Sequence, residues 1–233
     1  MVGLISEGDE SAYRAEVEEL TGWCTDNNLA LNTSKTKELV IDYRRKNNII
    51  PPLVISGDYV ERAPSFHFLG VHLDEDLTWS TNTAAIVKKA HQRLHFLRVL
   101  RNNKLSQELL VSFYRCSIES ILTYCINVWF GCCTAAERTT LQRVVNTAQR
   151  IIGRPLPSLA DLYSSRCLRK AQCIVEDPFH PGHRNLAMMP SGKRYRALCT
   201  GTTRYRDSFF PRAIAALNDN LISERGLARS RCI

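Results

Sequence analysis

The sequence predicts an α+β protein in which a small sheet with one helix precedes a mostly helical region. Short runs of β-forming residues, separated by glycine and proline, are concentrated before about residue 80. Apolar residues at helical spacing dominate from Thr81 onward. At 233 residues and 44% apolar content, the chain is long enough to bury a substantial core.

Charge divides the chain at the same place. Residues 1–80 contain 7 Lys and Arg against 14 Asp and Glu, a net charge of −7. Residues 81–233 contain the other 24 Lys and Arg against 9 Asp and Glu, a net charge of +15, and the sum is the +8 of the whole chain. Such an asymmetry predicts that the second region contacts a polyanion such as RNA or DNA. A solvated basic surface is the alternative.

We expect no signal peptide at the start of this sequence, because it is acidic at Glu7, Asp9 and Glu10 rather than basic and then apolar. The nine cysteines are therefore expected to be reduced thiols, which predicts an intracellular location, in the nucleus or the cytoplasm. The apolar stretch 117–133 contains Glu119 and Asn127, and this predicts a buried helix rather than a bilayer span.

In the first region, Tyr13, Val17, Leu20 and Cys24 recur at helical spacing and predict a helix over 9–27. The sequence Ser-Gly-Asp at 56–58 predicts a hairpin turn. The strands expected around these elements are 37–43, 53–55, 59–61 and 66–73.

In the second region, the first helix is predicted over about 83–101 and a second over about 106–130. A third begins at Thr134, where Glu137 completes a capping-box pattern, and ends at Gly153. Less periodic sequence follows. The elements expected there are a fourth helix over 158–174, irregular chain over 177–206, a short helix over 208–217 and a tail over 221–233.

Two sequence blocks carry a family resemblance. They are Leu-Ala-Leu-Asn-Thr-Ser-Lys-Thr at 29–36 and Phe-His-Phe-Leu-Gly-Val at 66–71, the latter followed by Leu-Asp and Leu-x-Trp. These blocks resemble the post-catalytic palm of reverse transcriptases from LINE-type non-LTR retrotransposons. The resemblance implies a partial palm over 1–80, a helical thumb-like region over 81–157, and a basic, partly disordered C-terminal region over 158–233.

The resemblance also implies where the chemistry of the ancestral RNA-directed DNA polymerase lies. The two metal-binding aspartates precede the matched region in that family, so we expect them upstream of Met1, and magnesium only in the intact ancestral enzyme. We therefore expect no catalytic residue, no cofactor and no enzymatic activity in this chain alone. Lys35 matches a lysine assigned as proton donor to the departing pyrophosphate; the alternative is an ordinary surface lysine.

A second implied site is the primer grip, a hairpin that holds the 3′ end of the primer. The residues that match it are Phe68, Leu69, Gly70 and Val71. The alternative is an ordinary core strand with a glycine kink.

The helix after the primer grip corresponds to the polymerase thumb, which follows the backbone of the duplex. Ten basic residues are expected to neutralise phosphates without reading sequence. We expect weak, sequence-tolerant RNA or DNA binding, with Tyr195, Tyr205 and Phe209 available for stacking or, alternatively, for core packing. The basic residues are Lys88, Lys89, Arg93, Arg98, Arg101, Lys104, Arg194, Arg196, Arg204 and Arg206.

Two further groups of residues raise the possibility of a metal site, and we predict none. The first group has the spacing Cys-x5-Cys-x6-His-x2-His, which is not common for zinc. The second, His72 and Asp74, has the strand spacing of two ligands of an iron oxygenase, but alternating strand residues explain it. The first group comprises Cys167, Cys173, His180 and His183, with Cys199 nearby.

Residues 116–152 carry another resemblance, through Tyr124, Cys125, Trp129 and the segments 134–137 and 141–145. They resemble the N-terminal segment of an AlkB-type alkylated DNA repair protein, the eighth homologue. This implies an alternative function as an accessory of alkylated nucleic acid repair or tRNA modification, by a methyltransferase or a 2-oxoglutarate dioxygenase. An inert pseudogene product is the other alternative. We prefer a reverse-transcriptase fragment with residual nucleic-acid binding.

Overall fold

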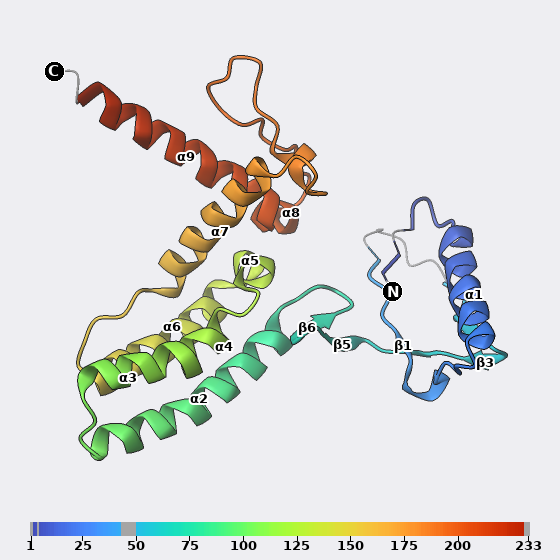
Figure 1. Ribbon diagram of the computed structural model, residues 1–233, viewed down its shortest axis with the longest axis horizontal. Coiled ribbons are helices and arrows are strands. Elements are labelled where there is room, and N and C mark those ends of the chain that lie inside the picture. Colours follow the sequence, from blue (N-terminus) through green and yellow to red (C-terminus); the bar gives the residue numbers. More distant parts are fainter. Residues whose placement is uncertain (1, 4, 43–49, 231–233) are drawn as a thin grey trace. The chain divides into compact units, whose positions relative to one another are not determined.

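The computed structural model describes residues 2–3, 5–42 and 50–230, and divides the chain into two compact units, Met1–Thr78 and Trp79–Ile233 (Figure 1). The named strands all lie in the first unit, as sheets of two strands each, and helices dominate the second. The predicted α+β class is therefore confirmed.

The first unit begins with α1, Ser11–Asp26, and continues with short strands. β1 pairs in parallel with β4, β2 with β3 as a hairpin, and β5 with β6 as a second hairpin. Its core is small: Val17, Leu53, Ile55 and Val60 are buried together. The further elements are a 3-10 turn Thr33–Lys35, β1 Lys37–Glu38, β2 Val54–Ile55, β3 Asp58–Tyr59, β4 Glu61–Arg62, β5 Ser65–Phe68 and β6 Val71–Asp74.

Three strand predictions in this unit are wrong in extent. The strand expected over 59–61 is divided between the end of β3 and the start of β4. The strand expected over 37–43 is β1 alone, and residues 43–49 lie outside the described part of the chain. The single strand expected over 66–73 is instead the β5–β6 hairpin. Its turn is made by Leu69 and Gly70, whose φ angles of 45° and 84° are both left-handed. Two left-handed residues are what a two-residue hairpin turn requires.

The second unit is a helical assembly in which α2 packs on α6, and α7 packs on α9. Leu94, Leu97, Leu110 and Leu141 are essentially fully buried in it. Its helices are α2 Ser80–Asn102, α3 Gln107–Tyr114, a π turn Arg115–Glu119, α4 Ser120–Leu122, α5 Ile126–Trp129, a 3-10 turn Phe130–Cys132, α6 Ala135–Ile152, α7 Leu159–Glu176, a 3-10 turn His183–Leu186, α8 Thr203–Asp207 and α9 Phe209–Ser230.

The predicted limits of α6 are confirmed by its caps. The Thr134 hydroxyl accepts a hydrogen bond from the Glu137 amide, and the Glu137 carboxylate accepts one from the Thr134 amide at 2.7 Å. Gly153 ends the helix with a left-handed φ of 77°.

The single helix expected over 106–130 is wrong, because the chain breaks at Cys125, which has a left-handed φ of 48°. A break frees backbone carbonyls that would otherwise accept helical hydrogen bonds. Here Arg166 Nη1 donates to the Thr123 carbonyl, and Trp129 Nε1 donates to the Tyr124 carbonyl, both at 2.9 Å. The break is therefore stabilised by a nearby side chain, Trp129, and by Arg166, which is more than 40 residues away in sequence.

The segment Gln107–Cys132 is long and apolar enough to cross a membrane by length and composition alone, which is weak evidence because buried core helices pass the same test. Leu110, Tyr114, Ile118 and Leu122 from this segment are fully buried among the other helices. The burial agrees with the expectation of a core segment.

The tail expected over 221–233 is also wrong, since α9 continues to Ser230. Ile214 and Leu217 are buried against α7, and Leu221 continues their stripe one turn further. The preceding segment is tied to α9 by Asn218, whose side chain accepts from the Tyr195 amide at 2.7 Å and donates to the Tyr195 carbonyl at 3.3 Å.

Candidate nucleic-acid interface

The candidate interface begins with the way α2 divides its residues between core and solvent. Ile86, Ala90, Leu94 and Leu97 recur at intervals of four, four and three, and all four are buried. Asn82 and Thr83 near the start of the helix are buried as well, whereas every predicted phosphate-binding residue on α2 or directly after it is exposed. Among the described residues, none of these six side chains forms an ion pair. They are Lys88, Lys89, Arg93, Arg98, Arg101 and Lys104.

The exposed lysines and arginines of α2 fall on both sides of its buried stripe. Lys88 and Arg98 lie on one face together with His91 and His95, because the four residues recur at intervals of three, four and three on a helix with about 3.6 residues per turn. Lys89 and Arg93 are four residues apart and lie together on the other side. The helix therefore has two basic edges rather than a single basic stripe.

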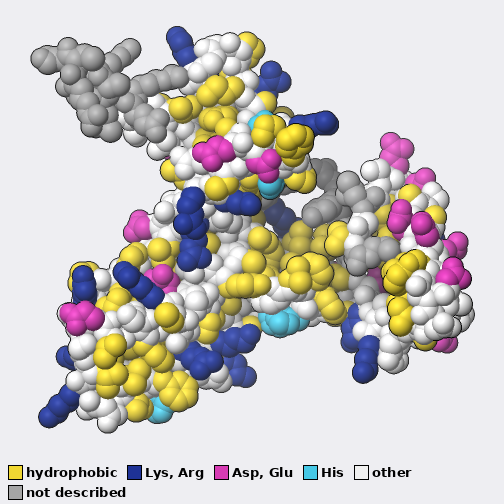
Figure 2. Space-filling view, viewed as in Figure 1, with side chains coloured by type: hydrophobic (Ala, Val, Ile, Leu, Met, Phe, Trp, Pro, Cys, Tyr) yellow, Lys and Arg dark blue, Asp and Glu magenta, His cyan; other side chains and the backbone are white. Residues whose placement is uncertain are grey.

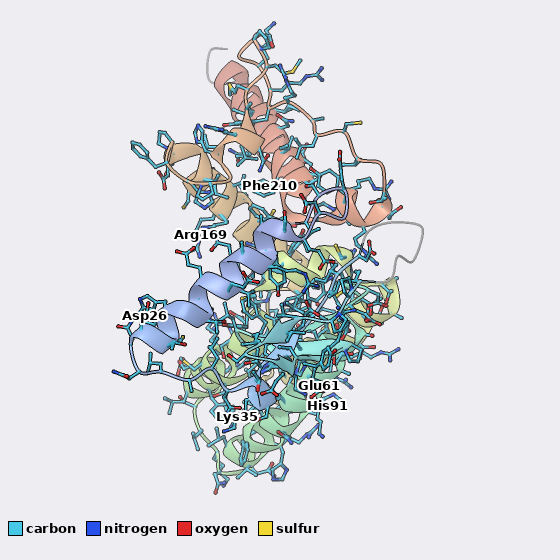
Figure 3. The ribbon with its side chains drawn as sticks, turned by 90° about the vertical axis from the view of Figure 1, so that its right-hand side faces the viewer. Asp26, Lys35, Glu61, His91, Arg169 and Phe210 are labelled. Carbon is cyan, nitrogen blue, oxygen red and sulfur yellow. The ribbon has the colours of Figure 1, made fainter. Side chains whose placement is uncertain are left out.

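A groove of about 750 Å³ lies between α2 and the start of α6. Lys88 and His91 contribute to its wall from α2, and Glu137 contributes from α6 (Figure 3 labels His91). The carboxylate of Glu137 is engaged in the helix cap, because it accepts from both the amide and the hydroxyl of Thr134. The remaining lining residues are small or uncharged: Ser80, Thr83, Ala84, Val87, Gln92, Ala136 and Thr140.

The predicted C-terminal arginines lie on other elements. Arg194 is exposed on the loop closed by the Met188–Tyr195 bridge, Arg196 is exposed directly after it, and Arg204 and Arg206 are exposed on α8. Asp207 offsets part of this charge, because it forms an ion pair with Arg212 at 2.6 Å and a long one with Arg206 at 4.0 Å. The arginines form a second basic set that is separate in sequence from α2.

The structure changes the set of aromatic side chains available for stacking. Tyr195 is buried in the α7–α9 core and Phe209 packs against it, so core packing is correct for both. Tyr205 stays exposed between two arginines of α8. Phe96, which is 50% exposed on α2, is an available aromatic side chain that was not among the predicted ones. Its position outside the buried stripe was the signal that could have identified it.

Lys35 lies at the end of the 3-10 turn after α1, with an exposed side chain (Figure 3). The Asn32 side chain accepts from the Lys35 amide at 3.1 Å and from the Ser34 hydroxyl at 2.7 Å. Asn32 thus fixes the turn that presents the lysine. The role of Lys35 as an ancestral proton donor stays a prediction.

The residues matched to the primer grip form the tip of the β5–β6 hairpin. Phe68 and Val71 are cross-strand partners, and Leu69 at the turn is 74% exposed. The alternative of a core strand with a glycine kink is wrong, because Gly70 lies in the turn. Contact with a primer stays a prediction.

No group of three or more His, Cys, Asp or Glu side chains in the described part of the chain is placed to hold a metal ion. His180 Nδ1 accepts from the Gly182 amide at 3.0 Å, and His183 Nδ1 lies 3.0 Å from the Ile174 carbonyl. His180 therefore stabilises its local turn, and His183 contacts the end of α7. Burial raises the pKa of the Cys167 thiol to about 11, and burial does the same for Cys133, so both are weak nucleophiles and ligands at neutral pH.

Comparison with known proteins then identifies relatives. Over 135 residues the chain is 26% identical to the "probable RNA-directed DNA polymerase from transposon BS" of Drosophila melanogaster. The chain is distantly related to a transposon reverse transcriptase. The match covers 57% of this chain and 15% of the fly protein, so the chain corresponds to a small part of its relative. No solved structure gives a significant match.

A family model described as "Alkylated DNA repair protein alkB homolog 8, N-terminal" matches residues 79–120. The resemblance to that family is therefore confirmed, but its position is not the expected 116–152, and the two ranges share only 116–120. The matched residues cover α2, α3 and the following π turn. The capping box of α6 that contributed to the expectation lies outside the match.

Proposed function

We propose that this retrotransposon-derived chain binds RNA or DNA without sequence preference, as a remnant of the post-catalytic palm and thumb of a LINE-type reverse transcriptase. The distant homology to a transposon polymerase supports the derivation. The observation that carries the binding function is a set of six exposed basic residues that form no ion pair within the described part of the chain. They lie on α2 or directly after it: Lys88, Lys89, Arg93, Arg98, Arg101 and Lys104. The proposal assigns no polymerisation to the chain alone, and treats Lys35 as a residue of ancestral chemistry.

The mechanism of binding would be neutralisation of phosphates by lysine and arginine, with release of the counterions condensed on the nucleic acid. Figure 2 shows Lys and Arg side chains distributed over the helical unit, whereas Asp and Glu are prominent on the N-terminal unit. The proposal places the chain in the nucleus or the cytoplasm, where cysteines stay reduced.

The test is fluorescence anisotropy of the full chain with single-stranded RNA, single-stranded DNA and duplex DNA over a series of salt concentrations. The variant Lys88→Gln, Lys89→Gln, Arg93→Gln should reduce the slope of log affinity against log salt. Each lost contact should change the slope by about 0.7 for a single strand and about 0.9 for a duplex.

The matched control is Arg169→Gln, Lys170→Gln, Arg184→Gln, which removes the same charge from exposed positions on α7 and the following 3-10 turn (Figure 3 labels Arg169). This control should keep the slope of the wild-type chain. Equal losses in both variants would show that only net charge matters. Absence of salt-dependent binding by the wild-type chain would contradict the proposed function and favour an inert product.

A second candidate function is favoured by the family match to residues 79–120. In that case the α2–α3 pair would be an accessory segment of an alkylated nucleic acid repair protein, and a partner would supply the catalytic domain. Competition between alkylated and unmodified oligonucleotides separates the two functions. The retrotransposon-derived function predicts equal competition, and the repair function predicts preference for the alkylated strand.

A further inference from the structure

We propose that Phe96 makes one basic edge of α2 a stacking platform for single-stranded nucleic acid. The inference rests on the proposed function and specifies its substrate: strands whose bases are unpaired. The platform consists of Lys89, Arg93 and Phe96.

Helical geometry places these three residues together. Their intervals of four and three put them on one face of α2, over about 10 Å of helix. All three side chains are exposed. Arg93 therefore lies about one turn from Phe96 along the helix, and Lys89 lies about two turns from it.

Phe96 is half exposed even though its neighbour Leu97 is fully buried. The core of the helical unit is already supplied by the stripe that contains Leu94 and Leu97, so folding places no demand on Phe96. The ring of His95 meets it in an edge-type arrangement, with centroids 5.8 Å apart and planes inclined by 67°. This contact is not a parallel stack, so it does not sandwich the Phe96 ring.

The charge of α2 favours a polyanion over an apolar protein partner. Its 23 residues include five lysines and arginines and no aspartate or glutamate. A protein docked on this edge would have to bring acidic groups to Lys89 and Arg93, or leave them desolvated at a cost in affinity. Nucleic acid supplies phosphates for the cations and a base for the ring at once.

The ring distinguishes single strands from duplexes. Bases in a duplex are already stacked on each other, whereas an unpaired base exposes a face that an aromatic side chain can cover. Stacking of this kind tolerates any base, which agrees with sequence-tolerant binding. Lys89 and Arg93 would contact phosphates of a single strand or of a duplex, so they add affinity without a preference for unpaired strands.

The experiment compares Phe96→Ala, Phe96→Leu and Phe96→Tyr in the full chain by anisotropy at fixed salt. The probes are an unstructured pyrimidine single strand and a duplex of equal length. Phe96→Ala and Phe96→Leu should weaken single-strand binding about 10-fold. Duplex affinity and the salt slope should stay near wild-type values, and Phe96→Tyr should retain binding. Leu109→Ala, which truncates another exposed apolar side chain, on α3, is the control and should bind as the wild type does.

Three results would overturn the inference. These are full single-strand affinity in Phe96→Leu, equal losses on strand and duplex, and a change in oligomeric state on gel filtration that accounts for the loss. The last result would make Phe96 part of a contact between protein copies. If the wild-type chain binds and the Phe96 variants bind equally well, the stacking platform is rejected but the proposed function is not. If the wild-type chain shows no salt-dependent binding, the proposed function is rejected as well.

Discussion

The two units of the chain differ in how completely they bury their own apolar side chains. In the helical unit Leu97, Leu110, Tyr114 and Trp129 are fully buried. In the N-terminal unit the described core residues are few, and Trp23 on α1 is 56% exposed. The comparison teaches that most of the packing free energy of this chain resides in the helical unit.

The units also use their charges differently. The N-terminal unit pairs cations with acids of its own, as in Arg14–Glu10 and Lys37–Glu61. In the helical unit α2 carries cations without any acidic residue. Ion pairs therefore occupy several cations of the N-terminal unit, which stays acidic overall, whereas α2 keeps a basic field that attracts an external anion.

The largest contrast in stability is expected from the tryptophans. Trp129→Ala removes a fully buried ring and its hydrogen bond to the Tyr124 carbonyl, and should lower the free energy of unfolding by about 3–5 kcal/mol. Trp23→Ala should change it by less than about 0.5 kcal/mol, because that ring is mostly in water. Urea denaturation followed by circular dichroism measures both. Similar losses in the two variants would contradict the contrast between the units.

A smaller effect is expected at the helix break. Arg166→Met leaves the Thr123 carbonyl without its side-chain donor inside the helical unit, which should cost about 1–3 kcal/mol. Arg169→Met, at an exposed position on the same helix, is the matched control and should be nearly neutral. Thermal unfolding of the two variants checks the difference. An unchanged melting temperature for Arg166→Met would mean that water replaces the donor.

Local patterns in the sequence predicted the helical unit better than the N-terminal one. The α2 stripe and the Thr134–Glu137 box depend on residues close together in sequence, so spacing alone identified them. The left-handed residue Cys125 could not be predicted in this way, because Arg166 supports the break from more than 40 residues away. The extension of α9 likewise depends on α7, against which Leu221 packs.

The candidate interface was predictable only in part for the same reason. Exposed cations follow from the buried stripe of α2, so Lys88 and Arg93 were identified directly. Aromatic residues are ambiguous in sequence, since they serve cores and interfaces equally well. Tyr195 is buried and Phe96 is exposed, and only tertiary packing distinguishes them.

The cap of α6 should contribute about 1 kcal/mol. Thr134→Ala removes the acceptor for the Glu137 amide and half of the capping box. Thr139→Ala is the matched control within the same helix. The Thr139 hydroxyl donates a hydrogen bond to the Ala135 carbonyl and does not cap the helix. Because alanine favours helix interiors, this control should be neutral or slightly stabilising. Equal losses in the two variants, measured by urea denaturation, would show that the cap adds nothing beyond side-chain removal.

The smallest effect is expected at the ion pair that joins β1 to β4 in the N-terminal unit. Lys37 Nζ lies 2.9 Å from a Glu61 carboxylate oxygen, but the two side chains are 39% and 64% exposed. Water and salt screen such a pair, so Glu61→Gln should cost less than about 0.5 kcal/mol (Figure 3 labels Glu61). The adjacent pair Arg62–Glu38 has the same strand register but a Glu38 side chain only 9% exposed. Glu38→Gln should therefore lower the free energy of unfolding more than Glu61→Gln does. Added salt should change the effect of Glu38→Gln little, because salt screens a carboxylate with so little exposure less. Equal effects of the two substitutions in urea denaturation at low salt would show that burial does not set the strength of charge pairing in this unit.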